Sequence, residues 1–151
     1  MTPQILLFGK NGQLGWELSR SLAVLGEVMV YDFPDVDFNK PETLGPLVLS
    51  AKPDAVINAV AYTNVDKAES EPDAARRVNA EAVGEIAKAA AKLSIPMVHV
   101  STDFVFDGNK GAPYEETDAP NPISVYGATK LQGDEMALAL NPKNFVVRPA
   151  W

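Results

Sequence analysis

The sequence predicts an α/β fold built on a doubly wound parallel sheet, within a single domain of 151 residues. Near-continuous apolar runs recur along the chain, for example at residues 5–8 and 55–60, and such runs are typical of strands buried on both faces. Segments with a helical spacing of apolar residues lie between these runs. Because strands and helices alternate throughout, we expect parallel strands joined by helical crossovers.

Composition restricts the classes of partner and of chemistry. The net charge is −7 and no basic cluster occurs, which argues against nucleic acid or an anionic membrane as a partner. There is no cysteine, which excludes a disulfide framework, a thiolate nucleophile and a cysteine-ligated metal within this chain. No apolar run reaches membrane-spanning length and no basic stretch precedes the first strand, so we expect a cytoplasmic protein.

The first strand leads directly into a glycine turn. The strand ends at Gly9. Two more glycines follow, Gly12 and Gly15, and a helix is predicted over residues 15–25. Glycines let the backbone turn tightly and approach a ligand, and a helix N-terminus offers unpaired N–H groups and a positive dipole end, which suits a pyrophosphate. The spacing is G-x-x-G-x-x-G rather than the G-x-G-x-x-G of typical dinucleotide dehydrogenases, so an ordinary strand–turn–helix corner is the alternative.

The second predicted strand, residues 28–32, ends in a carboxylate. Asp32 lies 17 residues after the last glycine of the turn, where a dinucleotide-binding fold places an acid against the adenosine ribose hydroxyls. A water-facing acid at a strand end is the alternative. A minimal strand is predicted at residues 36–38, and Asp37 either reaches an adenine ring or caps the next helix, residues 41–51.

The apolar run at residues 55–60 predicts a central strand. Residues 61–63 then leave the sheet at a strand C-terminal end, where ligands bind in doubly wound folds. Residues 66–93 are predicted to be largely helical, and Pro72 suits the start of the main helix. Asn79 falls in mid-helix, and the sequence does not determine which way it points.

Residues 95–103 form the next predicted strand, which ends in Ser-Thr-Asp on the ligand side. It holds the only histidine, His99, which we expect to pack in the core, since one histidine without cysteines is a poor basis for a metal site. The connection over residues 104–125 is long, non-periodic and rich in glycine, proline and aromatic residues, so we expect a lid. A helix over residues 126–140 and a buried strand over residues 144–150 complete the chain.

Tyr126 and Lys130 are spaced i and i+4, so they share one helix face. A lysine ammonium beside a tyrosine favours the phenolate and is expected to lower its pKa, which makes the tyrosine usable as a general acid and base. Thr102 can add a hydrogen bond to a substrate carbonyl. The pair directly follows a strand end with Ser-Thr-Asp and a long loop, which favours a catalytic pair over an ordinary surface pair.

Five segments in order span the chain: L-L-F-G-K-N-G-Q-L-G-W-E-L, N-A-V-A-Y-T-N-V-D-K-A-E-S-E-P, S-T-D-F-V-F-D-G, Y-G-A-T-K-L-Q-G-D and R-P-A-W. On these segments the chain resembles the dTDP-4-dehydrorhamnose reductases of the extended short-chain dehydrogenase/reductase superfamily. The resemblance implies an NAD(P)-binding Rossmann domain with strand order 3-2-1-4-5-6, residues 36–38 forming strand 3. Family members are longer and the chain stops directly after a strand, so we expect residues 1–151 to be the N-terminal part of a reductase, truncated before its substrate-binding C-terminal part.

The resemblance also implies roles for individual residues. The expected catalytic residues are Thr102, Tyr126 and Lys130, and the expected substrate contacts are Thr102, Asp103 and Trp151. The expected cofactor contacts are Gly9, Gly12, Gln13, Leu14 and Gly15 at the pyrophosphate, Asp32, Asp37 and Phe38 at the adenosine, Ala61, Tyr62 and Thr63 at the far half of the cofactor, and Tyr126 and Lys130 at the nicotinamide end.

The reaction implied by the resemblance is hydride transfer from NADPH or NADH to C4 of dTDP-4-dehydro-L-rhamnose, with Tyr126 supplying the proton and dTDP-L-rhamnose as product. No Arg or Lys directly follows Asp32, so the sequence lacks an obvious clamp for a 2′-phosphate, and Asp32 favours NADH, although the family commonly accepts both. Members often form homodimers with bound Mg²⁺. Glu17 matches one metal-contacting position, but its partners would lie beyond Trp151, so we predict no metal site in this chain.

Three other functions compete with this interpretation. Related 4,6-dehydratases carry Ser-Thr-Asp-Glu, and Phe104 replaces that glutamate here, so dehydration lacks its acid–base partner. A 4-epimerase usually has Ser-Ser where this chain has Ser101 and Thr102. A non-catalytic NADP-binding regulatory subunit, like that of methionine adenosyltransferase, is the third. An intact set of Thr102, Tyr126 and Lys130 favours catalysis over that role without excluding it.

Overall fold

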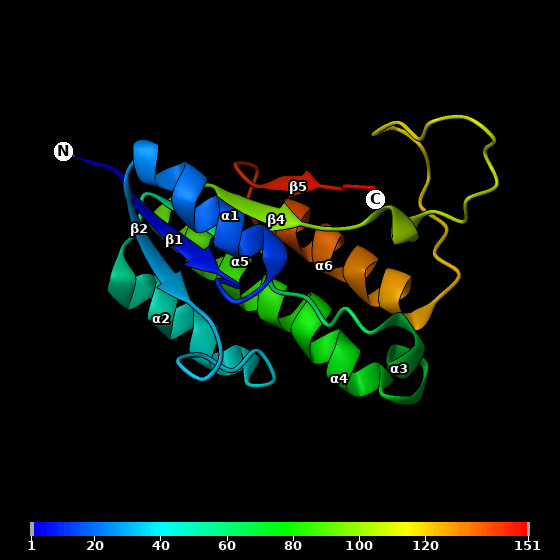
Figure 1. Ribbon diagram of the computed structural model, residues 1–151, viewed down its shortest axis with the longest axis horizontal. Helices are drawn as coiled ribbons and strands as arrows, with labels where there is room; N and C mark the ends of the chain where they lie inside the picture. The colour runs from blue at the N-terminus through cyan, green and yellow to red at the C-terminus, as the bar shows by residue number, and fades with distance from the viewer. Residues whose placement is uncertain (1, 151) are drawn as a thin grey trace.

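The computed structural model describes residues 2–150, which form a five-stranded parallel sheet in the order β2-β1-β3-β4-β5 (Figure 1). Each neighbouring pair of strands runs parallel, and β1 pairs with β2 on one side and β3 on the other. The predicted fold class is therefore confirmed. The strands are β1 Gln4–Phe8, β2 Glu27–Tyr31, β3 Ala55–Asn58, β4 Met97–Val100 and β5 Phe145–Val147.

Helices connect the strands, as the alternating pattern predicts. A π-helical turn, Arg77–Glu81, joins α4 to α5, and Pro72 starts α4 at its first turn, where its missing N–H costs nothing. Short 3-10 turns lie at Leu22–Val24, Pro41–Thr43 and Asp103–Val105. The α-helices are α1 Gln13–Ser21, α2 Leu44–Ala51, α3 Val65–Ser70, α4 Pro72–Arg76, α5 Ala82–Leu93 and α6 Val125–Leu140.

Alternate side chains of β1 enter two separate cores, because successive residues of a strand point to opposite faces. Leu6 and Phe8 are fully buried in the larger core, which contains residues of α2 and α5. Ile5 and Leu7 lie in a smaller core on the other face, against Leu18 of α1. The sheet is thus covered on both faces, which explains why its central strands are apolar throughout.

The predicted minimal strand at residues 36–38 does not form, so the expected strand 3 is absent from the sheet within residues 2–150. Backbone groups of this segment are used in turns instead: Val36 N donates to Asp32 O at 3.1 Å and Lys40 N donates to Asp37 O at 2.9 Å. Val36 and Phe38 are nevertheless buried. Their apolar side chains serve the core, and the remaining five strands keep the predicted relative order.

The predicted burial of the last strand is wrong. Phe145 is 62% exposed and Val147 is 50% exposed. The cause is position rather than composition: β5 lies at the edge of the sheet and pairs only with β4 among the described residues. An apolar run by itself cannot distinguish an edge strand from a central one.

The parallel arrangement brings the carboxyl ends of all strands to one side of the sheet. In Figure 1 the arrowheads of β1, β4 and β5 point toward the same side as the start of α6 and the long loop that precedes it. This is the side on which ligands bind in doubly wound sheets. No helix in residues 2–150 is both long and apolar enough to cross a membrane.

Candidate active site

The glycine turn after β1 has a shape that only glycine permits. Gly9 has a φ of +100°, and Gly12 N donates to Gly9 O at 3.1 Å. A Cβ on Gly15 would lie 1.8 Å from the carbonyl oxygen of Gly9, so the helix start packs directly on the turn. This close approach explains why the third position of the turn is glycine.

The first turn of α1 contains Gln13 and Leu14, as predicted for a pyrophosphate site. Its N-cap is Gly12, and within the described residues no side chain hydrogen-bonds to cap this helix. The N–H groups of the first turn are therefore free to bind an anionic group, which the dipole of a helix N-terminus also favours.

Asp32 lies directly after β2 and holds the glycine turn. Its Oδ2 accepts a hydrogen bond from Asn11 N at 2.8 Å, and its Oδ1 accepts one from Phe33 N at 2.7 Å. Beside it, Lys10 pairs with Asp35 at 2.9 Å. The carboxylate thus joins the end of β2 to the loop between Gly9 and Gly12, and its predicted contact with a ribose stays a prediction.

A hollow of about 250 Å³ lies at the ends of β2 and β3. It brings together five of the predicted cofactor contacts, which are separated by up to thirty positions in the chain. Asp37 lines it and accepts a hydrogen bond from Asn39 N at 2.9 Å, whereas the N-cap of the following helical turn is Lys40, so the helix-capping alternative for Asp37 is wrong. Thr63 is not one of the lining residues. The lining residues are Asp32, Phe33, Val36, Asp37, Phe38, Asn39, Val60, Ala61, Tyr62 and Val78.

Asn79 fixes the loop that follows β3. Its side chain is fully buried, its Oδ1 accepts from Tyr62 N at 2.8 Å, and its Nδ2 donates to Thr129 Oγ1 at 3.1 Å. The hydroxyl of Tyr62 in turn donates to Glu71 Oε2 at 2.7 Å. One amide therefore joins the cofactor-side loop to α6. This role is not evident from the sequence, although a lone asparagine among apolar helical residues is a signal.

Thr102 and Tyr126 meet where β4 ends and α6 begins. Thr102 is buried, and its hydroxyl oxygen accepts from Phe104 N at 3.2 Å. The rings of Phe104 and Tyr126 pack edge to face with centroids 5.6 Å apart. A Cβ on Gly127 would lie 2.2 Å from Phe104 O, so the helix can approach the strand end only because this residue is glycine.

The N-terminus of α6 is held at two points. Ser124 Oγ accepts from Gly127 N at 3.0 Å, and Glu69 Oε1 accepts from Val125 N at 2.8 Å. Ser and Glu oxygens are suited to this role because the first N–H groups of a helix have no partner within it. The position of Tyr126 in the first turn of α6 is thereby fixed by two contacts, one from the N-cap residue Ser124 and one from Glu69 of α3.

Lys130 points into the protein rather than to solvent. It is 1% exposed, and its Nζ donates to Val100 O at 2.7 Å and lies 3.3 Å from His99 Nε2. Burial lowers the pKa of Lys130 from 10.5 to about 8, while the charge of Asp134 opposes that change.

The expected lowering of the Tyr126 pKa by Lys130 is wrong for this structure. Burial of the ring raises the pKa of Tyr126 above 10, and the charges of Asp103 and Asp134 act in the same direction, while hydrogen bonding with Thr102 opposes them. The ammonium of Lys130 is directed to the end of β4. A shared helix face therefore does not make two side chains contact each other.

A buried polar cluster lies beneath Lys130. His99 is fully buried, as predicted, but in polar surroundings: its Nδ1 lies 3.2 Å from Asn58 Nδ2 and its Nε2 lies 3.7 Å from Asp134 Oδ1. Asp134 is also fully buried, and its Oδ2 accepts from Ser101 Oγ at 2.8 Å and from Arg148 Nε at 3.0 Å. Sequence reasoning missed Asp134, although it continues the i, i+4 spacing of Tyr126 and Lys130.

The loop between the Asp103–Val105 turn and α6 is ordered by its own side chains. The rings of Phe106 and Tyr114 stack with centroids 4.1 Å apart. Asp107 accepts hydrogen bonds from Asn109 N, Tyr114 Oη and Asn121 Nδ2, each at 2.9 Å, and these contacts lower the pKa of Asp107 to about 2. These contacts hold the loop together from within, and its role as a lid stays a prediction.

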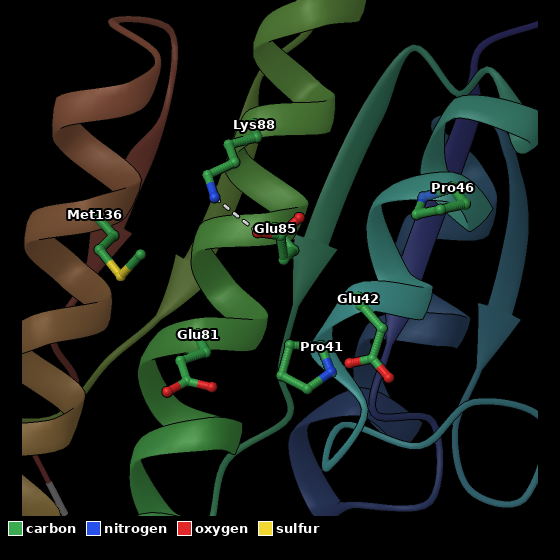
Figure 2. Close-up of a pocket in the computed structure, with 7 residues that line it drawn as sticks. All are labelled: Pro41, Glu42, Pro46, Glu81, Glu85, Lys88 and Met136. Atoms are coloured by element: carbon green, nitrogen blue, oxygen red, sulfur yellow. Dashed lines mark hydrogen bonds and ion pairs between the residues drawn. The ribbon is translucent and has the colours of Figure 1, made fainter.

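A larger hollow, of about 590 Å³, lies away from the strand ends on the outer side of the helices. Figure 2 shows it between the segment that begins α2, the helix α5 and Met136 of α6, with Lys88 Nζ paired to Glu85 Oε1 at 2.7 Å. It contains none of the predicted site residues. Its lining residues are Pro41, Glu42, Pro46, Glu81, Glu85, Lys88 and Met136.

Two predicted positions fall outside this arrangement. Trp151 lies outside the described residues, so its predicted substrate contact stays a prediction. Glu17 is exposed on α1, 4.0 Å from Arg20. Among residues 2–150 no three acidic or histidine side chains come together in a way that would hold a metal ion.

Comparison with known proteins identifies the family. Residues 3–151 match the family described as the RmlD substrate binding domain. The chain is 54% identical over 136 residues to dTDP-4-dehydrorhamnose reductase of Burkholderia thailandensis, covering 90% of this chain and 45% of that protein. It is 47% identical over 151 residues to dTDP-4-dehydrorhamnose reductase of Escherichia coli K12, covering 97% of this chain and 50% of that protein.

The fold comparison agrees with the sequence comparison. A crystal structure of dTDP-4-dehydrorhamnose reductase from Bacillus anthracis in complex with NADP matches with a TM-score of 0.94 at 34% identity, covering all of this chain and 54% of that one. The chain spans about half the length of the curated relatives it matches. Because the match extends over residues 3–151, the chain belongs to the family of the RmlD substrate binding domain.

Proposed function

We propose that the protein containing this chain reduces the C4 keto group of dTDP-4-dehydro-L-rhamnose to dTDP-L-rhamnose with NADPH or NADH. The observation that carries the proposal is that Tyr126 lies beside Thr102 at the end of β4, while the ammonium of Lys130 reaches the same strand end at Val100 O. The relatives named dTDP-4-dehydrorhamnose reductase and the NADP complex of one of them support both the reaction and the cofactor.

The residues present fit a dinucleotide. Gly15 packs so closely on Gly9 that a side chain would collide with the Gly9 backbone, and the uncapped first turn of α1 lies at the end of β1. The hollow beside Asp32 and Asp37 has a volume of about 250 Å³ and is lined by both polar and apolar groups, as an adenosine requires. We assign the pyrophosphate to the glycine turn and the adenosine to this hollow.

The reduced nicotinamide, when bound, supplies the hydride. Tyr126 supplies the proton, and a general acid must be protonated when the reaction begins. Burial raises the pKa of Tyr126, so its hydroxyl stays protonated at neutral pH and can donate to the carbonyl oxygen. We assign to Thr102 a second hydrogen bond to that oxygen. We assign Lys130 to the nicotinamide ribose.

The test uses the full-length protein, NADPH and dTDP-4-dehydro-L-rhamnose, with the nicotinamide absorbance as readout. We expect a fall in absorbance that depends on the sugar nucleotide. Tyr126→Phe should reduce turnover by about 10²- to 10⁴-fold, the usual contribution of a general acid, while the cofactor still binds. Tyr31→Phe is the matched control, because Tyr31 packs on Phe8 away from the proposed acid and should keep turnover.

Two outcomes would contradict the proposal, each at a different point. Unchanged turnover in Tyr126→Phe would remove Tyr126 as the acid while leaving the reductase. Absence of sugar-dependent NADPH oxidation by the unmodified protein, with cofactor binding demonstrated in parallel, would remove the reductase and favour an epimerase or a regulatory subunit.

A further inference from the structure

The buried cluster under α6 determines which nitrogen of His99 carries the proton. Val60 N donates to Asn58 Oδ1 at 3.1 Å, and a backbone N–H can only donate. The orientation of the Asn58 amide is thereby set, with its Nδ2 directed at His99 Nδ1 at 3.2 Å. Since the amide nitrogen is also only a donor, His99 Nδ1 must accept, and the proton of a neutral imidazole must lie on Nε2.

The imidazole is neutral because of where it lies. His99 is fully buried, and burial together with the charge of Lys130 lowers its pKa well below 6.5. Its Nε2–H faces two groups: Asp134 Oδ1 at 3.7 Å and Lys130 Nζ at 3.3 Å. An ammonium carries only donors, so a protonated Lys130 cannot accept this hydrogen.

Asp134 Oδ1 is the acceptor that remains. It is the buried side-chain oxygen for which the described part of the chain provides no hydrogen-bond partner, whereas Oδ2 of the same carboxylate accepts from Ser101 and Arg148. Leaving a buried carboxylate oxygen unpaired is costly, and a small side-chain movement would bring Oδ1 within hydrogen-bond length of His99 Nε2. The carboxylate and the imidazole are therefore complementary.

The consequence concerns Lys130. An imidazole that donates from Nε2 cannot accept an N–H of Lys130. Within residues 2–150 the ammonium therefore makes one hydrogen bond, to Val100 O at 2.7 Å, and has two N–H groups left. We propose, building on the function assigned above, that Asp134 and His99 are positioning residues for Lys130: the carboxylate holds the imidazole as an Nε2–H donor, so that the ammonium keeps its remaining N–H groups for cofactor and substrate.

The charged groups around Lys130 give the sign of the expected pH effect. His99 faces it from β4 and Asp134 lies four positions along α6, while Arg148 and the hydroxyl of Ser101 face Asp134 in turn. The negative charge of Asp134 raises the pKa of Lys130, and burial lowers it to about 8. Removing the carboxylate therefore lowers the pKa of Lys130 further, and the ammonium is lost at a lower pH.

The first experiment reads the tautomer directly and needs no turnover. The full-length protein is labelled with ¹⁵N-histidine, and the His99 signal is assigned by its loss in His99→Gln. We expect a neutral imidazole protonated at Nε2 throughout the neutral pH range. A ring protonated at Nδ1, or an imidazolium, would overturn the proposal, and either result would be independent of whether the protein is a reductase.

The second experiment compares two variants by the pH dependence of kcat/KM. In Asp134→Asn the amide can still accept from Ser101 or Arg148 but has lost the charge, so the alkaline limb should move to lower pH by roughly one unit. Ser101→Ala is the control, because it removes a contact to Oδ2 and leaves Oδ1 opposite His99, and its alkaline limb should stay in place. An alkaline limb that Asp134→Asn leaves unmoved would refute the positioning role. Should this variant fail to fold, the tautomer of the unmodified protein decides.

Discussion

The proposed active-site residue Lys130 is buried at the expense of stability. An ammonium that is 1% exposed has lost nearly all of its hydration, and the pKa of Lys130 is lowered from 10.5 to about 8. The folded protein therefore binds fewer protons than the unfolded chain between about pH 8 and 10.5, so stability rises with pH across this window. Below about pH 8 the full cost applies, about 3 kcal/mol at 1.36 kcal/mol per pKa unit.

We predict that Lys130→Met raises the free energy of unfolding at pH 7. Methionine fills a similar volume without a charge, so the gain should be about 2 kcal/mol once the lost hydrogen bond to Val100 O is subtracted. The gain should shrink by about 2 kcal/mol at pH 9.5, where most of the cost in the unmodified protein has gone. Urea unfolding at both pH values measures it. Lys92→Met, at an exposed position of α5, should show no such pH dependence, and a Lys130→Met gain that is equal at both pH values would contradict this account.

The helix α6 holds Tyr126 where it is because Gly127 has no side chain. The helix start meets the backbone of the Asp103–Val105 turn, and Phe104 O occupies the place that a Cβ would need, at 2.2 Å. The obstacle is backbone, which cannot move aside as a flexible side chain can. The distance between Thr102 and Tyr126 thus depends on a contact in which neither residue takes part.

We predict that Gly127→Ala lowers both stability and turnover. The helix must move away from the turn, which should cost about 1–3 kcal/mol of unfolding free energy and should lower kcat more than it weakens cofactor binding. Thermal unfolding and steady-state kinetics measure the two effects. Gly45→Ala in α2 is the matched control: its Cβ would lie 3.6 Å from Glu85 O, an ordinary contact, so this variant should be stabilised by about 0.5–1 kcal/mol. Equal behaviour of the two variants would show that crowding at Phe104 is unimportant.

The loop before α6 depends on Asp107, which accepts hydrogen bonds from three loop residues. Its pKa is lowered to about 2 from 3.8, so the stabilisation that it gives is complete above about pH 3.8 and is lost as the pH falls through about 2. At neutral pH the carboxylate is ionised and holds the loop.

We predict that Asp107→Asn loosens this loop at neutral pH while leaving the sheet intact. An amide carries one acceptor oxygen in place of two and cannot satisfy the same donors. Hydrogen exchange should become faster between residues 106 and 121, and limited proteolysis should cut there first. Glu116→Gln, at an exposed loop position, provides the control. Unchanged exchange in Asp107→Asn would show that the aromatic stack of Phe106 and Tyr114 orders the loop by itself.

The parallel sheet assembles the whole site at one side of the molecule. The glycine turn follows β1, Asp32 follows β2, Tyr62 lies after β3 and Thr102 lies after β4. Each is placed by a strand end, and Tyr126 and Lys130 reach the end of β4 from the helix α6. The start of this helix lies on the same side as the arrowheads of β1, β4 and β5 (Figure 1). Residues far apart in the chain therefore converge without any long-range signal in the sequence.

Alternation of apolar runs and helical periods was sufficient to predict the parallel sheet, its helices and the side on which the candidate site lies. It failed at residues 36–38, where apolar side chains are buried from turns rather than from a strand, and at β5, where the edge of the sheet leaves Phe145 exposed. Both failures share one cause. Apolar residues indicate that a segment tends to be buried. Whether the segment forms a strand, and whether that strand is central, depends on which neighbouring strands its backbone can pair with.

The sequence by itself determined the glycine turn, the Tyr126–Lys130 spacing and the Ser-Thr-Asp strand end, because these are local patterns within a few residues. Only the tertiary structure decided that Lys130 turns toward Val100 and His99, that burial raises the pKa of Tyr126, and that Asp134 lies beneath them. The physical reason is that desolvation and hydrogen-bond partners come from elements distant in the chain. Asn58, His99 and Asp134 become one cluster only when β3, β4 and α6 have packed together.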